Sequence, residues 1–169
     1  GYVYALTLSG KPKWRTHYGR PWTGGTPGSR GTPTLNDGLL YVMSGWGKVV
    51  CLDPDTGRIQ WSVDTMKKFG ARRITWGITE SLLVVDEKVI VTPGGAKAGM
   101  VALHKKTGRT IWACEELKDK SGYCSPILIE RGGKRIIVTL TGQSFVGVTL
   151  EDGRLLWRDP RKVAHDIHA

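Results

Sequence analysis

A short pattern that recurs four times along the chain constrains its fold more than any other feature. Each copy has an apolar residue, a small residue and a second apolar residue. After a short variable segment come glycine, lysine or arginine, two further residues and tryptophan. The tryptophans, Trp14, Trp61, Trp112 and Trp157, are 47, 51 and 45 residues apart, a period typical of a four-stranded β-propeller blade. The pattern predicts an all-β chain of about three and a half four-stranded blades, from a propeller of about seven or eight blades.

Each element of the pattern has a physical role in such a blade. Gly57, Gly108 and Gly153 stand where a tight hairpin turn is expected, because glycine adopts positive φ values without strain. The tryptophan is expected to fill the gap between neighbouring blades, where its indole N–H needs a hydrogen-bond acceptor. We therefore interpret these three glycines and the four tryptophans as structural, and the small residue as the space that close packing requires.

Composition and turn residues divide the chain into blades. The 23 glycines and 8 prolines suit many short strands joined by tight turns. We expect the end of a blade at 1–18, complete blades at 26–66, 75–116 and 121–160, and a tail at 161–169. The predicted strands are 32–35, 39–43, 49–52 and 59–63; then 80–85, 88–92, 100–103 and 110–113; then 124–129, 135–140, 145–149 and 155–158. Because open sheet edges invite pairing, we expect further repeats at both ends, or assembly with copies of this chain.

The residues around the second tryptophan carry a family resemblance. Residues 51–61 read Cys-Leu-Asp-Pro-Asp-Thr-Gly-Arg-Ile-Gln-Trp. They resemble the Ala-x-Asp-x-x-Thr-Gly-x-x-x-Trp signature of the pyrroloquinoline-quinone-type (PQQ-like) propeller repeat family, with Cys51 in place of alanine. Residues 102–112 match it with His104 in place of aspartate. The resemblance covers essentially the whole chain and implies a propeller fold. The family includes quinoprotein alcohol dehydrogenases, which hold the quinone and calcium in the central funnel, and an outer-membrane assembly lipoprotein that is a binding scaffold.

The marks of those dehydrogenases can be sought directly. The enzymes resemble one another in an adjacent cysteine pair, a carboxylate base, and Glu and Asn ligands for calcium, whereas Cys51, Cys114 and Cys124 are far apart here. We therefore expect no catalytic residue, metal or cofactor in this chain. The resemblance implies a binding or protein-interaction scaffold, periplasmic or otherwise extracytoplasmic. The alternative is a fragment of a PQQ-dependent alcohol dehydrogenase-like quinoprotein, which would bring PQQ and calcium.

Propellers tend to bind ligands on the loops that lead into the innermost strands. Aligning the blades on Thr32, Ser81 and Ser125 places four candidate ligand-binding residues near one opening: Arg30, Trp76, Glu80 and Tyr123. A cation, a carboxylate and two aromatic rings suit a protein, a small molecule or a glycan at the channel mouth. The alternatives are a solvated loop cation for Arg30, a solvated or Arg-paired channel residue for Glu80, and inter-blade packing for both rings.

The chain is basic, with 25 lysines and arginines against 15 acidic residues and a formal net charge of +10. Clustered cations attract nucleic acid and other polyanions. Here most cations stand singly near turns, and the densest groups, at 67–73 and 105–106, are short. We therefore expect a solvated, mildly cationic surface rather than a nucleic-acid site, with another anionic partner as the alternative.

Three further features bear on chemistry and location. No apolar run approaches the ~18 residues of a membrane span, and no charged segment followed by a hydrophobic stretch opens the chain, so we expect neither membrane insertion nor a targeting segment. The cysteines form no CxxC pair, and the histidines are scattered, so no metal site is expected. Cys114 and Cys124 are either bridged across neighbouring blades or buried as small hydrophobic thiols.

Overall fold

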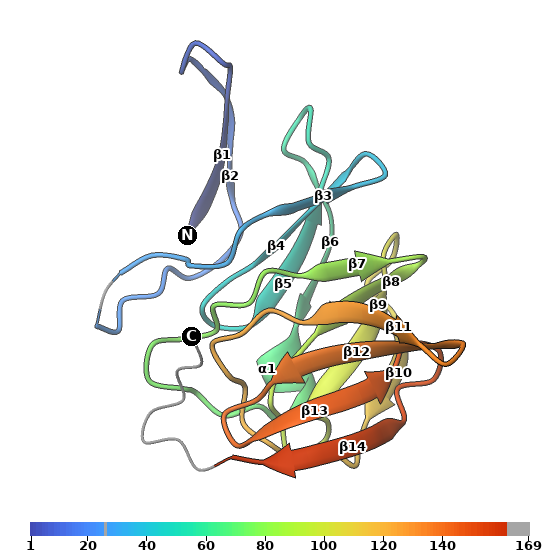
Figure 1. The fold of residues 1–169 in the computed structure, drawn as a ribbon. Coiled ribbons are helices and arrows are strands. Elements are labelled where there is room, and N and C mark those ends of the chain that lie inside the picture. Colours follow the sequence, from blue (N-terminus) through green and yellow to red (C-terminus); the bar gives the residue numbers. More distant parts are fainter. Residues whose placement is uncertain (26, 162–169) are drawn as a thin grey trace.

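The computed structural model describes residues 1–25 and 27–161, and it has the all-β architecture that the repeat predicts. Three four-stranded antiparallel sheets follow a two-stranded hairpin of β1 (Tyr2–Leu6) and β2 (Pro12–His17) (Figure 1). Blade 1 contains β3 (Thr34–Asn36), β4 (Leu39–Met43), β5 (Lys48–Leu52) and β6 (Ile59–Asp64). Blade 2 contains β7 (Leu83–Val85), β8 (Lys88–Val91), β9 (Met100–His104) and β10 (Thr110–Cys114). Blade 3 contains β11 (Ile127–Arg131), β12 (Lys134–Leu140), β13 (Ser144–Thr149) and β14 (Leu155–Pro160). The described residues thus form three blades of a propeller and the outer half of another.

The register of the outer two strands explains the spacing within the repeat. In every copy the small residue lies directly opposite the tryptophan, in the pairs Ala5–Trp14, Cys51–Trp61, Ala102–Trp112 and Gly147–Trp157. Just before each tryptophan the register shifts, so that one extra residue bulges from the outer strand. A Cβ atom built on Gly147 would overlap the Trp157 indole. The position opposite the ring therefore needs a small residue.

Three of the four tryptophans bind the turn of the following blade. The indole N–H of Trp61 donates to the carbonyl oxygen of Lys105 at 2.7 Å. Two further pairs repeat this bond, Trp14 with Pro54 at 2.9 Å and Trp112 with Leu150 at 3.0 Å. Trp157 packs on Phe145, with ring centroids 4.9 Å apart, and is 36% exposed. The indole thus contacts the neighbouring turn wherever a following blade is described.

The same indoles cover the glycines that the repeat predicts in the turns. Gly57, Gly108 and Gly153 have φ values of 71°, 70° and 75°, in the left-handed region that favours glycine. A Cβ atom built on Gly108 would lie 2.7 Å from the Trp61 ring. Glycine is therefore needed here both for the turn and for the approach of the ring.

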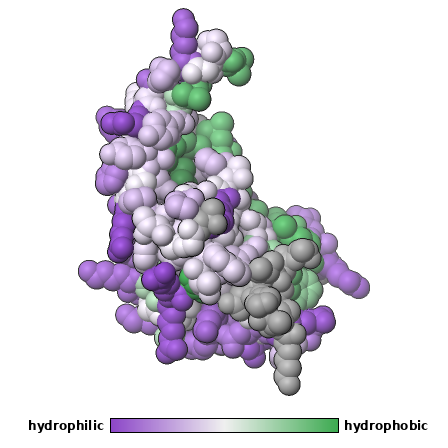
Figure 2. Space-filling view, turned by 90° about the vertical axis from the view of Figure 1, so that its left-hand side faces the viewer, coloured by the Kyte–Doolittle hydropathy of each residue, from purple (hydrophilic) through white to green (hydrophobic). Residues whose placement is uncertain are grey.

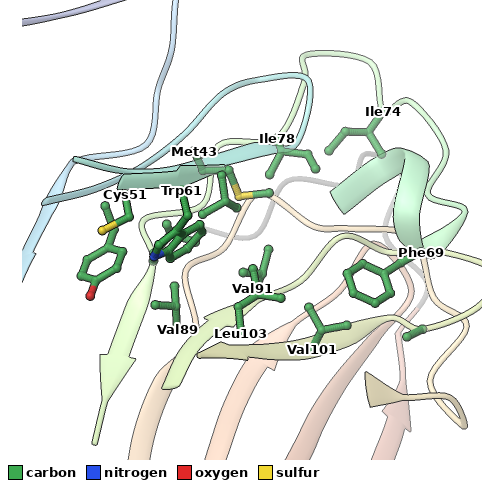
Figure 3. Packing of buried hydrophobic residues seen from close by; sticks show 14 residues of the cluster. Met43, Cys51, Trp61, Phe69, Ile74, Ile78, Val89, Val91, Val101 and Leu103 are labelled. Atoms are coloured by element: carbon green, nitrogen blue, oxygen red, sulfur yellow. The ribbon is translucent and has the colours of Figure 1, made fainter. Parts of the chain in front are cut away.

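The hydrophobic core lies between neighbouring sheets. Figure 3 shows side chains of β4 to β6 meeting those of β8 and β9, with Met43, Cys51 and Trp61 packed near Val89, Val101 and Leu103. A second cluster joins blade 2 to blade 3 and includes Trp112, Ile90 and Ile137. Each blade is therefore stabilised mainly by its neighbours, as in other repeat proteins.

The segments that enter the innermost strands are bonded from blade to blade. The Thr32 N–H donates to Ser81 Oγ, and the Ser81 N–H donates to Ser125 Oγ, each at 2.9 Å. These are the three positions that the sequence aligns. Thr32 and Ser81 bond to the next blade and Ser125 bonds to the preceding one, whereas β3, β7 and β11 begin only at residues 34, 83 and 127 instead of at 32, 80 and 124.

The two ends of the blades differ. The connections between blades (65–82 and 115–126) and the turns between second and third strands (44–47, 92–99 and 141–143) lie at one end, called the loop face below. The remaining hairpins lie at the other end, the turn face. There, Lys105 contacts Asp37 of blade 1 at 2.9 Å, and Arg135 contacts Asp86 of blade 2 at 2.7 Å. Ion pairs thus join neighbouring blades on the turn face.

One short helix departs from the expectation of strands and turns alone. α1 (Thr65–Phe69) follows β6; the Asp64 carboxylate accepts a hydrogen bond from the Lys67 N–H at 2.9 Å, and Gly70 ends the helix with a φ of 67°. Both are ordinary helix caps. No helix in residues 1–25 and 27–161 has the length and apolar character of a membrane span. Apart from its first residue, the tail expected at 161–169 lies outside the described residues.

The β1–β2 hairpin projects from the rest of the molecule (Figure 1), and apolar residues are exposed on it (Figure 2). Tyr2, Tyr4 and Leu6 are 48%, 58% and 56% exposed. In blades 1 to 3 the equivalent strand, the third, pairs with an inner strand on its other side. Among the described residues β1 pairs only with β2; Val3 packs into the core, whereas Tyr2, Tyr4 and Leu6 remain open to solvent.

Replacing Gly108 with alanine should destabilise the protein by about 2 to 4 kcal/mol, because a φ of 70° strains alanine and the new Cβ displaces the Trp61 ring. Gly38→Ala is the matched control, since Gly38 has a φ of 71° but no atom within 4 Å of its Cβ position. It should lose only about 1 to 2 kcal/mol from backbone strain. Urea unfolding measures both losses, and equal losses would contradict the role of glycine in docking.

Candidate ligand-binding site on the loop face

The loop face carries the residues that the sequence proposes as ligand contacts. Arg30 precedes β3, Trp76 and Glu80 precede β7, and Tyr123 precedes β11. The bonds between the entries of neighbouring blades draw these connections together. The structure joins three of the four residues at the surface and places the fourth inside the protein.

Trp76 joins Arg30 to Tyr123. The backbone carbonyl of Trp76 accepts a hydrogen bond from the Arg30 guanidinium at 2.6 Å, and its backbone N–H donates to the Tyr123 hydroxyl at 3.0 Å. The two rings lie 5.4 Å apart and are tilted by 51°. Arg30 is exposed, while both rings are half-buried. This Arg30–Trp76–Tyr123 cluster therefore combines inter-blade packing with partly open aromatic faces and a cation, the groups that bind planar or sugar-like ligands.

Glu80 lies apart from this cluster. It is 1% exposed, and both of its carboxyl oxygens lie 3.1 Å from the backbone nitrogen of Thr92, whose N–H donates to them. Burial raises the pKa of the Glu80 carboxyl to about 8, and the bond from Thr92 only partly opposes that shift. The solvated or arginine-paired channel residue that the sequence suggests is therefore a buried, largely neutral carboxyl group.

A second aromatic group on the loop face was not predicted. The rings of Trp22 and Trp46 lie 4.7 Å apart, and the Arg73 guanidinium lies over them at 5.2 and 5.6 Å. Arg20 covers Trp46 from 4.5 Å. A hollow of about 470 Å³ lies against Trp46 and Arg20. Neither tryptophan belongs to the repeat. Their position in connecting segments, outside the predicted strands, was the sequence feature that could have marked them as candidate ligand contacts.

Within the described part of the chain, the potential metal ligands are dispersed and the cysteines are free. No three His, Cys, Asp or Glu side chains gather as metal ligands within residues 1–25 and 27–161. Cys51 and Cys114 are buried free thiols, and Cys124 is a half-buried free thiol. The sequence left open whether Cys114 and Cys124 form a disulfide or are free thiols. In the structure they are free.

The fold and this site define a propeller whose blades carry different loops on one face. A family model described as outer membrane protein assembly factor BamB matches residues 1–166. The chain belongs to this family of PQQ-like propeller repeats. The resemblance seen in the repeat is thereby confirmed.

Curated relatives and solved structures give the range of the family. The chain is 27% identical over 146 residues to quinoprotein alcohol dehydrogenase PedH of Pseudomonas putida, covering 82% of this chain and 24% of that protein. It is 26% identical over 138 residues to a quinoprotein ethanol dehydrogenase of Pseudomonas aeruginosa, and the match covers 79% of this chain and 21% of that protein. The chain thus spans about a quarter of these relatives or less.

Among solved structures, the chain is similar to BamB from Moraxella catarrhalis, with a TM-score of 0.60 and 17% identity over 95% of this chain and 42% of that one. It is also similar to quinohemoprotein alcohol dehydrogenase ADHIIG from Pseudomonas putida, with a TM-score of 0.57 and 22% identity over 79% of this chain and 20% of that one. At these identities the similarity establishes the propeller fold, not an activity.

Replacing Glu80 with glutamine should make the protein less sensitive to pH. In the unfolded chain the Glu80 carboxyl loses its proton above about pH 4.5, whereas in the folded protein the carboxyl stays protonated up to about pH 8. The stability of the folded protein therefore falls as pH rises between these values. Glu80→Gln should therefore match the wild type near pH 5 and exceed it near pH 8 by about 2 to 5 kcal/mol, since one pKa unit corresponds to about 1.4 kcal/mol. Unfolding at both pH values measures this, with exposed Glu130→Gln as control. A pH-independent difference would contradict the assignment.

Proposed function

We propose that the chain is part of a non-catalytic propeller, located outside the cytoplasm, that binds a protein, small-molecule or glycan partner on its loop face. The observation that carries this proposal is the Arg30–Trp76–Tyr123 cluster, which unites three blades around one exposed cation and two half-buried rings. These side chains stack and hydrogen-bond, and they hold a partner without transferring protons at neutral pH. Similarity to an outer membrane protein assembly factor supports the extracytoplasmic location.

The state of Glu80 also favours binding over catalysis at this cluster. A general base has to reach the proton that it removes. The Glu80 carboxyl is instead buried and bonded to the Thr92 N–H. Its role is to hold the segment before β7 against the end of β8.

The second candidate function is a part of a PQQ-dependent alcohol dehydrogenase-like quinoprotein, favoured by the 27% identity to PedH. The quinone would supply the redox chemistry, and Trp76 and Tyr123 offer it aromatic surfaces. Calcium fits less well, because in the described part of the chain no three acidic, His or Cys side chains come together. Within these residues we therefore assign no catalytic step.

The two functions differ in their response to quinone and calcium. When PQQ and calcium are added, the protein carrying this chain should not reduce an electron-accepting dye in the presence of ethanol. Its tryptophan fluorescence should not be quenched either. Trp76→Ala is the control variant, because a quinone stacked on Trp76 would quench the wild type more than this variant. Alcohol-dependent dye reduction would overturn the scaffold proposal.

A further inference from the structure

A hollow on the loop face has a wall rich in cations. It encloses about 380 Å³ and is lined by Arg72, Gly94, Ala96, Lys118, Lys120 and Gln143, and is called the cationic pocket below. None of these residues is acidic. Within residues 1–25 and 27–161, Arg72, Lys118 and Lys120 form no ion pair with a carboxylate. Three positive side chains therefore line one hollow, and Lys118 Nζ also donates a hydrogen bond to the Lys97 carbonyl at 3.3 Å.

The acidic residue nearest in sequence turns away from the pocket. Asp119 lies between Lys118 and Lys120 but is only 4% exposed. Its carboxylate accepts hydrogen bonds from Thr141 Oγ1 and from the Arg158 guanidinium, each at 2.7 Å. The charge of Asp119 is thus compensated inside blade 3, and the two flanking lysines keep their charges at the surface.

Backbone hydrogen bonds hold the walls of the pocket in place. The Ala96 N–H donates to the Gly70 carbonyl at 3.1 Å, which ties the turn of blade 2 to the segment that carries Arg72. The Gly142 N–H donates to the Lys120 carbonyl at 2.9 Å, and the Lys120 N–H donates to Gln143 Oε1 at 3.1 Å. The three cations therefore project from segments that are already fixed.

We propose that the cationic pocket binds the phosphate group of a small phosphorylated molecule or of a lipid headgroup. A phosphate dianion matches three cations that line one hollow better than a single carboxylate does, and arginine and lysine are its usual partners. The volume lies within the range of small-ligand sites. With its Oε1 engaged, Gln143 presents its amide NH₂ as a further donor. This site is separate from the Arg30–Trp76–Tyr123 cluster. The proposal for it therefore does not depend on which of the two functions the propeller has.

Titration of the protein with inorganic phosphate at low ionic strength, followed by calorimetry, tests the site. We expect saturable binding in the millimolar range that weakens as salt is added, because salt screens exposed charges. The double variant Lys118→Gln/Lys120→Gln should bind at least about tenfold more weakly, since each lysine contributes a charge-assisted hydrogen bond. Arg72→Gln, on a different segment, should weaken binding in the same direction.

The matched control is Lys11→Gln/Lys13→Gln, which removes two exposed charges from the β1–β2 hairpin, away from the pocket. It should leave phosphate binding within about twofold of the wild type, and circular dichroism should show all variants folded. Absence of saturable binding, or equal losses in the pocket and hairpin variants, would overturn the proposal.

A second measurement separates the two sources of phosphate. Co-sedimentation with vesicles of phosphatidic acid and phosphatidylcholine, lost in Lys118→Gln/Lys120→Gln but not in the hairpin variant, would assign the pocket to a lipid headgroup. Binding of free phosphate without specific co-sedimentation would assign it to a soluble phosphorylated molecule. Failure of either probe leaves the scaffold proposal untouched, because that proposal rests on other residues.

Discussion

A tryptophan side chain buried between two sheets has to satisfy its indole N–H as well as fill a gap. In this chain, one contact does both: the indole of one blade bonds a turn carbonyl of the next and covers the glycine of that turn. The glycine, the small residue opposite the ring and the bulge before it are all consequences of this contact.

This docking fixes the blades by their outer strands and turn face, and it leaves the loop face free to vary. The ion pairs of Lys105 and Arg135 strengthen the same end. On the loop face, by contrast, the connections of the described residues differ in length and composition, and one of these connections contains the helix α1. Residues that differ between blades therefore gather away from the docked outer strands, on a face where hydrogen bonds between blade entries hold the connections together.

The sequence predicts what depends on local spacing and fails where tertiary contacts decide. Strand β4 lies at its predicted bounds, and the alignment of Thr32, Ser81 and Ser125 reappears as a chain of hydrogen bonds. The starts of the inner strands were wrong, because these residues bond to another blade. Burial of Glu80 could not be foreseen either, since it depends on how the turn after β8 folds over the carboxyl.

The loop face owes its charge to burial as much as to composition. Two acidic residues near it, Glu80 and Asp119, both lie inside the protein, but by different means. Burial raises the pKa of Glu80, so that this carboxyl is largely neutral. For Asp119, burial acts in the same direction, but hydrogen bonds from Arg158 and Thr141 outweigh it and lower its pKa. In one case the negative charge is absent, and in the other it is compensated within blade 3. A count of charges along the sequence treats these two carboxyls like exposed ones, whereas the fold removes the charge of Glu80 and compensates that of Asp119.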